Sequence, residues 1–306
     1  MRPVKLTALA LALASSLAFA GCRQDSGREA VASDPRREAV RAFWEQLHAA
    51  TGARMRRDCA AAAALYEQAL ALDPRHEDAL YYLGQCRREL ADPVAARTAF
   101  ERLVAVSPQS ARGELALGAL LASPDPAEPM DLAPAEAHLR RAHAINGEET
   151  GPVVRLGEVL LVSGRAGEAR EWFEAALRTN PKSVEAAFLA GFVAWDGGSG
   201  DVARLARRVR AAATIDTPVK GVLSEGDRRD AKRVAAPPLE SPLGRLLFGE
   251  PIAAVRGRAA AGQEIDDASL VGLWRETRLL RGRLTARSAT DTGDGPRPRN
   301  SEPQKR

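Results

Sequence analysis

Histidines and cysteines are the residues of this chain most able to do catalytic or metal chemistry, and their spacing supports neither. The two closest histidines, His138 and His143, are five residues apart, so they do not share a helix face as a zinc-binding pair must. A glycine-rich stretch at residues 196–201 lacks the following lysine of a phosphate-binding loop. The sequence has no nucleophile elbow and no CxxC pair. We therefore expect no enzyme activity, no cofactor and no metal site.

The elements that would position any site are helices, and they are arranged as a repeat. Residues 77–108 predict two helices that face each other across the break at 90–93. Small residues mark where the two backbones approach, and an aromatic residue fills the space beside them. The same spacing recurs along the chain, with 34 residues between Pro74 and Pro108. The matching positions are Ala62, Tyr66 and Pro74; Leu83, Gly84, Ala96, Phe100 and Pro108; and Leu156, Gly157, Ala169, Phe173 and Pro181.

Two further units keep the pattern less closely. One begins at Leu117-Gly118 and is five residues too long, with the proline-rich stretch 123–129 as the natural place for an insertion. The other begins at Ala190-Gly191, and its aromatic position is occupied by Arg207. A decayed pattern is expected of a terminal repeat.

This period, with Leu-Gly, Ala-x-x-x-Phe and a closing proline, resembles the tetratricopeptide repeat over roughly residues 36–212. The resemblance implies an all-α fold: a right-handed superhelical solenoid of about five helix-turn-helix units. It also implies a binding function, since the first helices of such units line a concave groove.

The amino terminus resembles a bacterial lipoprotein signal peptide at residues 1–21. Arg2 and Lys5 precede an apolar run of secretory length, and small residues stand directly before Cys22. The resemblance implies that Cys22 becomes the first residue of the mature protein and carries lipid. Ordinary cleavage after Ala20 is the alternative. Because Arg23 rather than an aspartate follows Cys22, we expect an exported protein anchored in the outer membrane and facing the periplasm.

The two remaining cysteines, Cys59 and Cys86, lie on helices that we expect to be antiparallel neighbours. An oxidising compartment would allow a disulfide between them, near the edge of bonding reach. The alternative is a pair of small buried thiols.

We divide the rest of the chain by composition. Residues 22–35 are small and polar and predict a tether, residues 36–213 the solenoid, and residues 286–306 a disordered tail. Between them, residues 214–285 hold an apolar island at 243–255 and an amphipathic helix that ends near Leu284. We expect this segment to cap the terminal repeat by folding back onto the solenoid.

The resemblance assigns the groove to particular positions of the first helices, which are polar at the amino end and aromatic at the carboxyl end. The predicted partner-binding residues are Tyr81, Gln85, Arg88, Leu115, Val154, Glu158, Phe188, Phe192 and Trp195. An aromatic stripe with a few polar groups suits a peptide segment. The alternative is that the island at 243–255 covers Phe188, Phe192 and Trp195. Tyr81, Gln85 and Arg88 would then be the better contacts for a partner.

Charge excludes one class of partner. Removal of residues 1–21 lowers the 44 basic residues to 42, against 40 acidic ones. A near-neutral chain has no footprint for nucleic acid. We predict a membrane-anchored adaptor or assembly factor that binds a segment of another envelope protein. Two alternatives stay open: an enzyme or small-ligand binder with its site in residues 214–284, and a passive structural lipoprotein.

Overall fold

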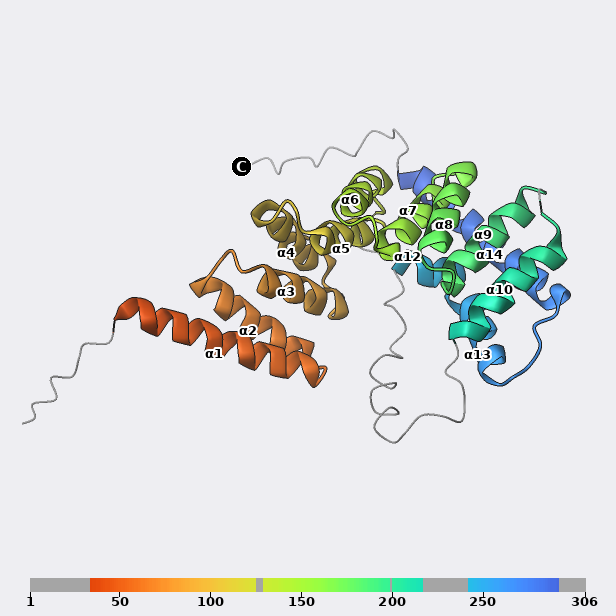
Figure 1. Cartoon of the computed structure of the whole chain (residues 1–306). Helices are drawn as coiled ribbons and strands as arrows, with labels where there is room; N and C mark the ends of the chain where they lie inside the picture. The colour runs from red at the N-terminus through yellow and green to blue at the C-terminus, as the bar shows by residue number, and fades with distance from the viewer. Residues whose placement is uncertain (1–33, 125–128, 199, 217–241, 292–306) are drawn as a thin grey trace, which may run out of the picture.

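The computed structural model describes residues 34–124, 129–198, 200–216 and 242–291, and the regular secondary structure in these ranges is helical. The solenoid is built from ten helices: α1 (Pro35–Met55), α2 (Cys59–Leu72), α3 (Glu77–Glu89), α4 (Pro93–Val106), α5 (Ala111–Leu121), α6 (Leu132–Ile145), α7 (Thr150–Val162), α8 (Ala166–Thr179), α9 (Val184–Asp196) and α10 (Val202–Asp216). Consecutive helices pack side by side along the chain, so these elements form the predicted solenoid of five helix-turn-helix units (Figure 1).

Side chains at the helix starts explain where several helices begin. Asp58 Oδ1 accepts a hydrogen bond from Ala61 N at 3.0 Å, and Asp92 Oδ1 accepts one from Ala95 N at 3.1 Å. Such caps satisfy backbone N–H groups that have no partner within the helix. Asp131 precedes α6 without making this bond.

Close packing within a unit depends on the predicted glycine and aromatic pair. A Cβ atom added to Gly84 would lie 2.4 Å from Phe100 Cε1, and one added to Gly157 would lie 2.4 Å from Phe173 Cε1. Both rings are fully buried. The glycine thus lets the ring of the second helix rest directly on the backbone of the first.

The turns inside the units share a backbone conformation that the sequence analysis did not anticipate. Arg57, Ala91, Gly164 and Gly198 all have positive φ angles, of 63°, 56°, 79° and 67°. Each is the second residue after a first helix, and 34 residues separate Arg57 from Ala91 and Gly164 from Gly198. Two units therefore place a glycine where the left-handed conformation is needed, and two do not.

Residues 242–291 form a further helical layer. A continuous helix comprises α12 (Pro242–Gly244), the π-helical turn η1 (Arg245–Gly249) and α13 (Glu250–Ala260), and α14 (Asp267–Asp291) follows it. The layer contacts α5, α7 and α9, which are first helices of their units, and also α10 (Figure 1). The apolar island is its buried side: Leu243, Leu247, Phe248, Ile252 and Val255 are all at most 1% exposed.

The core accordingly has two parts. One cluster comes from α1 to α4, and a larger one extends from α4 through α14 and includes the island. Tyr81 on α3 packs against both. The carboxyl-terminal segment is thus part of the larger core.

Several boundaries differ from those predicted. The solenoid begins at Pro35 and ends at Asp216, and α14 continues to Asp291, so the tail does not start at residue 286. The predicted signal peptide, residues 1–21, lies outside the described residues, as does most of the tether. Within the described ranges, no helix combines the length and the apolar character that a membrane crossing requires.

Candidate partner-binding groove

The carboxyl-terminal half of the predicted groove is filled by the chain itself. Phe188 and Phe192 on α9 have no exposed surface, and Trp195 is partly buried. Their cover is α14, whose Trp274 is also fully buried and lies 6.3 Å from Phe188 between ring centroids. Phe188 and Phe192 are therefore closed to an outside partner in this structure, and Trp195 is partly covered. An exposed stripe of such rings would be a large apolar patch in water, which explains the cover.

Trp274 also compensates for the weak fifth unit. A Cβ atom added to Gly191 would lie 2.7 Å from Trp274 Cζ2. In the units that keep the pattern, the ring against this glycine comes from the unit's own second helix, whereas here Arg207 is exposed to solvent. The cap thus supplies the aromatic ring that the terminal repeat lacks.

The predicted groove residues in the middle of the solenoid are also covered. Val154 and Glu158 on α7 are 3% and 1% exposed, and Arg155 Nη1 donates a hydrogen bond to Glu158 Oε1 at 2.8 Å. Leu115 on α5 is partly buried and packs against the larger core cluster. Val154 and Glu158 are therefore closed to a partner in this structure, because residues 242–291 complete the core above them, whereas Leu115 keeps part of its surface exposed.

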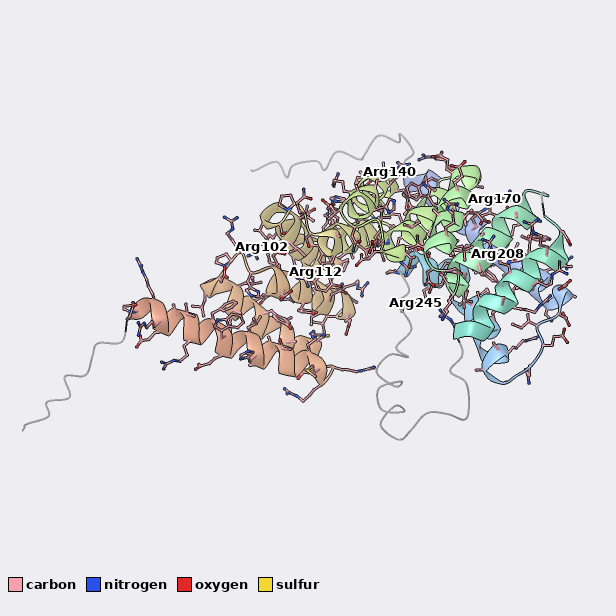
Figure 2. All side chains as sticks on the ribbon, in the orientation of Figure 1. Arg102, Arg112, Arg140, Arg170, Arg208 and Arg245 are labelled. Carbon is pink, nitrogen blue, oxygen red and sulfur yellow. The ribbon has the colours of Figure 1, made fainter. Side chains whose placement is uncertain are left out.

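The amino-terminal half of the groove contains an open pocket of about 850 Å³, bounded by α3, by the turn after α1 and by the start of the carboxyl-terminal layer. It includes the three predicted contacts at this end. Its lining consists of Arg54, Arg57, Tyr81, Tyr82, Gln85, Cys86, Arg88, Glu89, Ala91, Pro93, Leu120, Ser123, Pro124, Pro242, Arg245 and Leu246. Figure 2 shows Arg245 at the junction between the amino-terminal helix pairs and the carboxyl-terminal layer.

The lining carries four arginines and one glutamate. Within the described residues, Arg54, Arg57, Arg88 and Arg245 form no ion pair, and Glu89 accepts a hydrogen bond from Cys59 Sγ at 2.9 Å. Burial lowers the pKa of Arg88; Tyr81 and Glu89 act against this effect, and repulsion from Arg245 and Arg155 adds to it. With four arginines and one glutamate, the pocket lining therefore carries an excess of positive charge.

Two tyrosines give the pocket an aromatic wall. The Tyr81 and Tyr82 rings meet edge to face with centroids 5.2 Å apart. The guanidinium of Arg54 lies 4.1 Å above the Tyr82 ring, and that of Arg112, which pairs with Asp78, lies 4.9 Å above the Tyr81 ring. These contacts fix the positions of the rings.

Cys59 and Cys86 are free, buried thiols at the edge of this site. Burial raises the pKa of the Cys59 thiol to about 12, and the hydrogen bond to Glu89 and the neighbouring Cys86 thiol contribute. The structure thus has the buried-thiol arrangement, in which the two side chains lie near each other without a bond.

Sequence reasoning missed Arg54, Arg57 and Arg245 as site residues. Arg54 and Arg57 belong to a basic stretch that precedes a helix, and their place at a turn inside a unit was the available signal. Arg245 had none, because only the folded layer brings it to α3. Cys22 lies outside the described residues, and the described part of the chain has no cluster of three His, Cys, Asp or Glu side chains that could hold a metal ion.

Comparison with known families identifies the repeating unit. The model of the tetratricopeptide repeat family matches residues 47–111 and 154–214. The helix pairs within these ranges are tetratricopeptide repeats. The matched ranges hold the first, second, fourth and fifth units in whole or in part. The third unit, which contains the insertion, lies outside them.

Solved tetratricopeptide-like structures show the same architecture. A crystal structure of MamA is 20% identical and has a TM-score of 0.52; the likeness covers 60% of this chain and 99% of that one. A double mutant of MamA from strain RS-1 is 15% identical with a TM-score of 0.51, covering 56% and 94%. At these identities the likeness shows the fold alone. A comparison with curated proteins finds no match. Tetratricopeptide repeats are interaction scaffolds, which agrees with a groove for a partner.

Proposed function

We propose that this protein is a lipid-anchored adaptor of the bacterial cell envelope, which holds a segment of a partner protein in the open half of its groove. The observation that carries the proposal is the contrast between the two halves. α14 and the island cover the carboxyl-terminal groove residues, whereas Tyr81, Gln85 and Arg88 line an open pocket of about 850 Å³.

The chemistry of the pocket favours binding over catalysis. Its lining contains no histidine, and its thiol Cys86 is buried with a raised pKa, so it is a poor nucleophile. The lining also offers two tyrosine rings, the amide of Gln85 and four guanidinium groups, which recognise peptide segments well.

The anchor is the second half of the proposal. The small residues before Cys22 support lipidation of that cysteine, and several acyl chains on one residue would hold the protein stably, at about 0.8 kcal/mol for each buried methylene. Metabolic labelling with an alkyne fatty acid, followed by fractionation, tests the anchor. We expect label in the wild type and none in Cys22→Ser, while label in both variants would refute lipidation at this position.

Site-specific photocrosslinking in cells tests the groove. A benzophenone amino acid replaces Tyr82 in the pocket, and in a matched control it replaces Ala137, which is exposed on α6. We expect one discrete envelope protein to be crosslinked from position 82 and not from position 137. That product should disappear when Tyr81→Ala and Arg88→Ala are added.

Two outcomes would contradict the proposal. One is the same set of products from positions 82 and 137. The other is a product at position 82 that survives both substitutions with an unchanged yield, because a partner in the pocket must touch these side chains.

A further inference from the structure

The most unusual feature of the pocket is an excess of positive charge: four arginines and one glutamate line it. Ion pairs are common elsewhere: Arg87, Arg165 and Arg208 all bind carboxylates. The four pocket arginines have no such partner in the described part of the chain, although three segments contribute them: the end of α1 and its turn, α3 and η1. Guanidinium groups that are gathered and left unpaired favour an anionic ligand.

Arg88 and Arg245 form the centre of this arrangement. Both line the same pocket, and Arg88 is partly buried. Arg245 is among the charges that lower the pKa of Arg88, so the two guanidinium groups repel each other, whereas Glu89 attracts Arg88. A carboxylate between them would remove the repulsion and accept hydrogen bonds from both.

The rest of the lining favours a peptide over a small anion. The side-chain oxygen of Gln85 is buried and has no hydrogen-bond partner in the described structure, and a backbone N–H group can supply one. Tyr81, Tyr82 and Leu246 add an apolar wall, and Leu246 is 44% exposed. A pocket of about 850 Å³ has room for several residues of an extended segment.

We propose that the pocket binds an acidic segment of a partner protein. Carboxylates of the segment pair with Arg88 and Arg245, a backbone N–H group donates to Gln85, and an apolar side chain packs against Tyr81 and Leu246. This inference rests on the proposed function, since it names the kind of partner that the same pocket receives. It also gives the carboxyl-terminal layer a part in binding, because that layer contributes Arg245.

The experiment measures binding of three labelled twelve-residue peptides to the full chain by fluorescence anisotropy. The first alternates Asp and Glu with Leu and Phe, the second carries Asn and Gln in place of the acids, and the third carries Lys. We expect the acidic peptide to bind about tenfold more tightly than its amide counterpart, because charge-assisted hydrogen bonds are stronger than neutral ones. Raising the salt concentration should reduce this preference.

Two double variants test whether Arg88 and Arg245 cause the preference for the acidic peptide. Arg88→Gln combined with Arg245→Gln should abolish the preference for acid over amide. Arg204→Gln combined with Arg207→Gln removes the same charge from exposed positions on α10 and should leave the preference unchanged. Circular dichroism of each variant confirms that the helices are retained.

The outcomes separate this inference from the proposed function. Equal binding of the acidic and amide peptides, or a preference that both double variants reduce equally, would overturn the acidic segment. Crosslinking from position 82 would still test the adaptor function independently. A single-stranded oligonucleotide that competes as well as the acidic peptide at equal charge would also overturn the inference, because the site would then recognise polyanions in general.

Discussion

The indole ring of Trp274 on α14 stacks on that of Trp195 on α9, with centroids 6.0 Å apart and an interplanar angle of 29°. The stack joins the last helix of the described chain to the first helix of the terminal repeat. Next to it, Arg278 on α14 lies 4.3 Å above the Trp195 ring and pairs with Asp196, which also pairs with Arg281. Aromatic and ionic contacts therefore hold the cap in the same place.

Replacing Trp274 should destabilise the protein strongly. Trp274→Ala removes a fully buried indole and leaves a cavity against Phe188 and Gly191, so we expect a loss of about 3–5 kcal/mol in the free energy of unfolding. Urea denaturation followed by far-ultraviolet circular dichroism measures it. As a matched control, Trp44→Ala removes an indole that is 46% exposed and should cost much less. If α14 docks only loosely, Trp274→Ala and Trp44→Ala would lower the free energy of unfolding by similar, small amounts.

The glycines of the Leu-Gly positions should not tolerate alanine. Gly84→Ala would place a Cβ atom 2.4 Å from the Phe100 ring, and overpacking of this kind costs about 1–3 kcal/mol. Gly272→Ala, in α14, meets no atom within 4 Å and should instead stabilise the helix by about 0.5–1 kcal/mol. Thermal unfolding of the two variants should therefore shift in opposite directions. A rise for Gly84→Ala would show that the ring does not rest on this backbone.

The left-handed turns predict a stabilising substitution. Ala91 adopts a φ of 56°, which is unfavourable for a residue with a Cβ atom, whereas Gly164 and Gly198 adopt similar values freely. We expect Ala91→Gly to stabilise the protein by about 0.5–1 kcal/mol in chemical denaturation. A loss of stability in Ala91→Gly would mean that the turn holds Ala91 in this conformation without strain.

At Arg57, one substitution should change stability and peptide binding in opposite directions. Arg57→Gly relieves the same backbone conformation, with a φ of 63°, but removes a pocket guanidinium. We expect higher stability together with weaker binding of the acidic peptide. Measuring both quantities on one sample checks this, and Gly272→Ala, a stabilising substitution outside the pocket lining, serves as the control that changes stability alone.

The thiols predict how stability depends on pH. The pKa of Cys59 is raised to about 12, so the folded state keeps a proton that the unfolded state releases above about pH 9. Stability from this group is complete below that pH and is lost as the pH rises toward 12. Between pH 8 and pH 10 we expect Cys59 to contribute a loss of about 1–2 kcal/mol, and Cys59→Ala should lose less stability than the wild type by that amount. Urea midpoints at the two pH values measure it, and parallel slopes for both proteins would contradict it.

The repeat itself could be predicted from the sequence because its signals are local. A 34-residue period, a glycine at the helix contact and an aromatic residue sixteen positions after it all depend on neighbouring helices, so they appear as fixed spacings. Gly84 with Phe100 and Gly157 with Phe173 behave in the structure as those spacings predict. The apolar island at 243–255 could also be predicted from the sequence, because a segment that is buried is apolar whichever helices it packs against.

The sequence by itself determined the helices, their pairing and the polar amino end of the groove with Tyr81, Gln85 and Arg88. Only the tertiary structure decided that Phe188 and Phe192 are core, that Trp274 serves the terminal repeat, and that Arg245 joins Arg88 in one pocket. The physical reason is how far apart along the chain the contacting residues lie. Contacts within and between adjacent units follow from a fixed period, whereas residues 242–291 dock onto helices far earlier in the chain, where no spacing rule connects the partners.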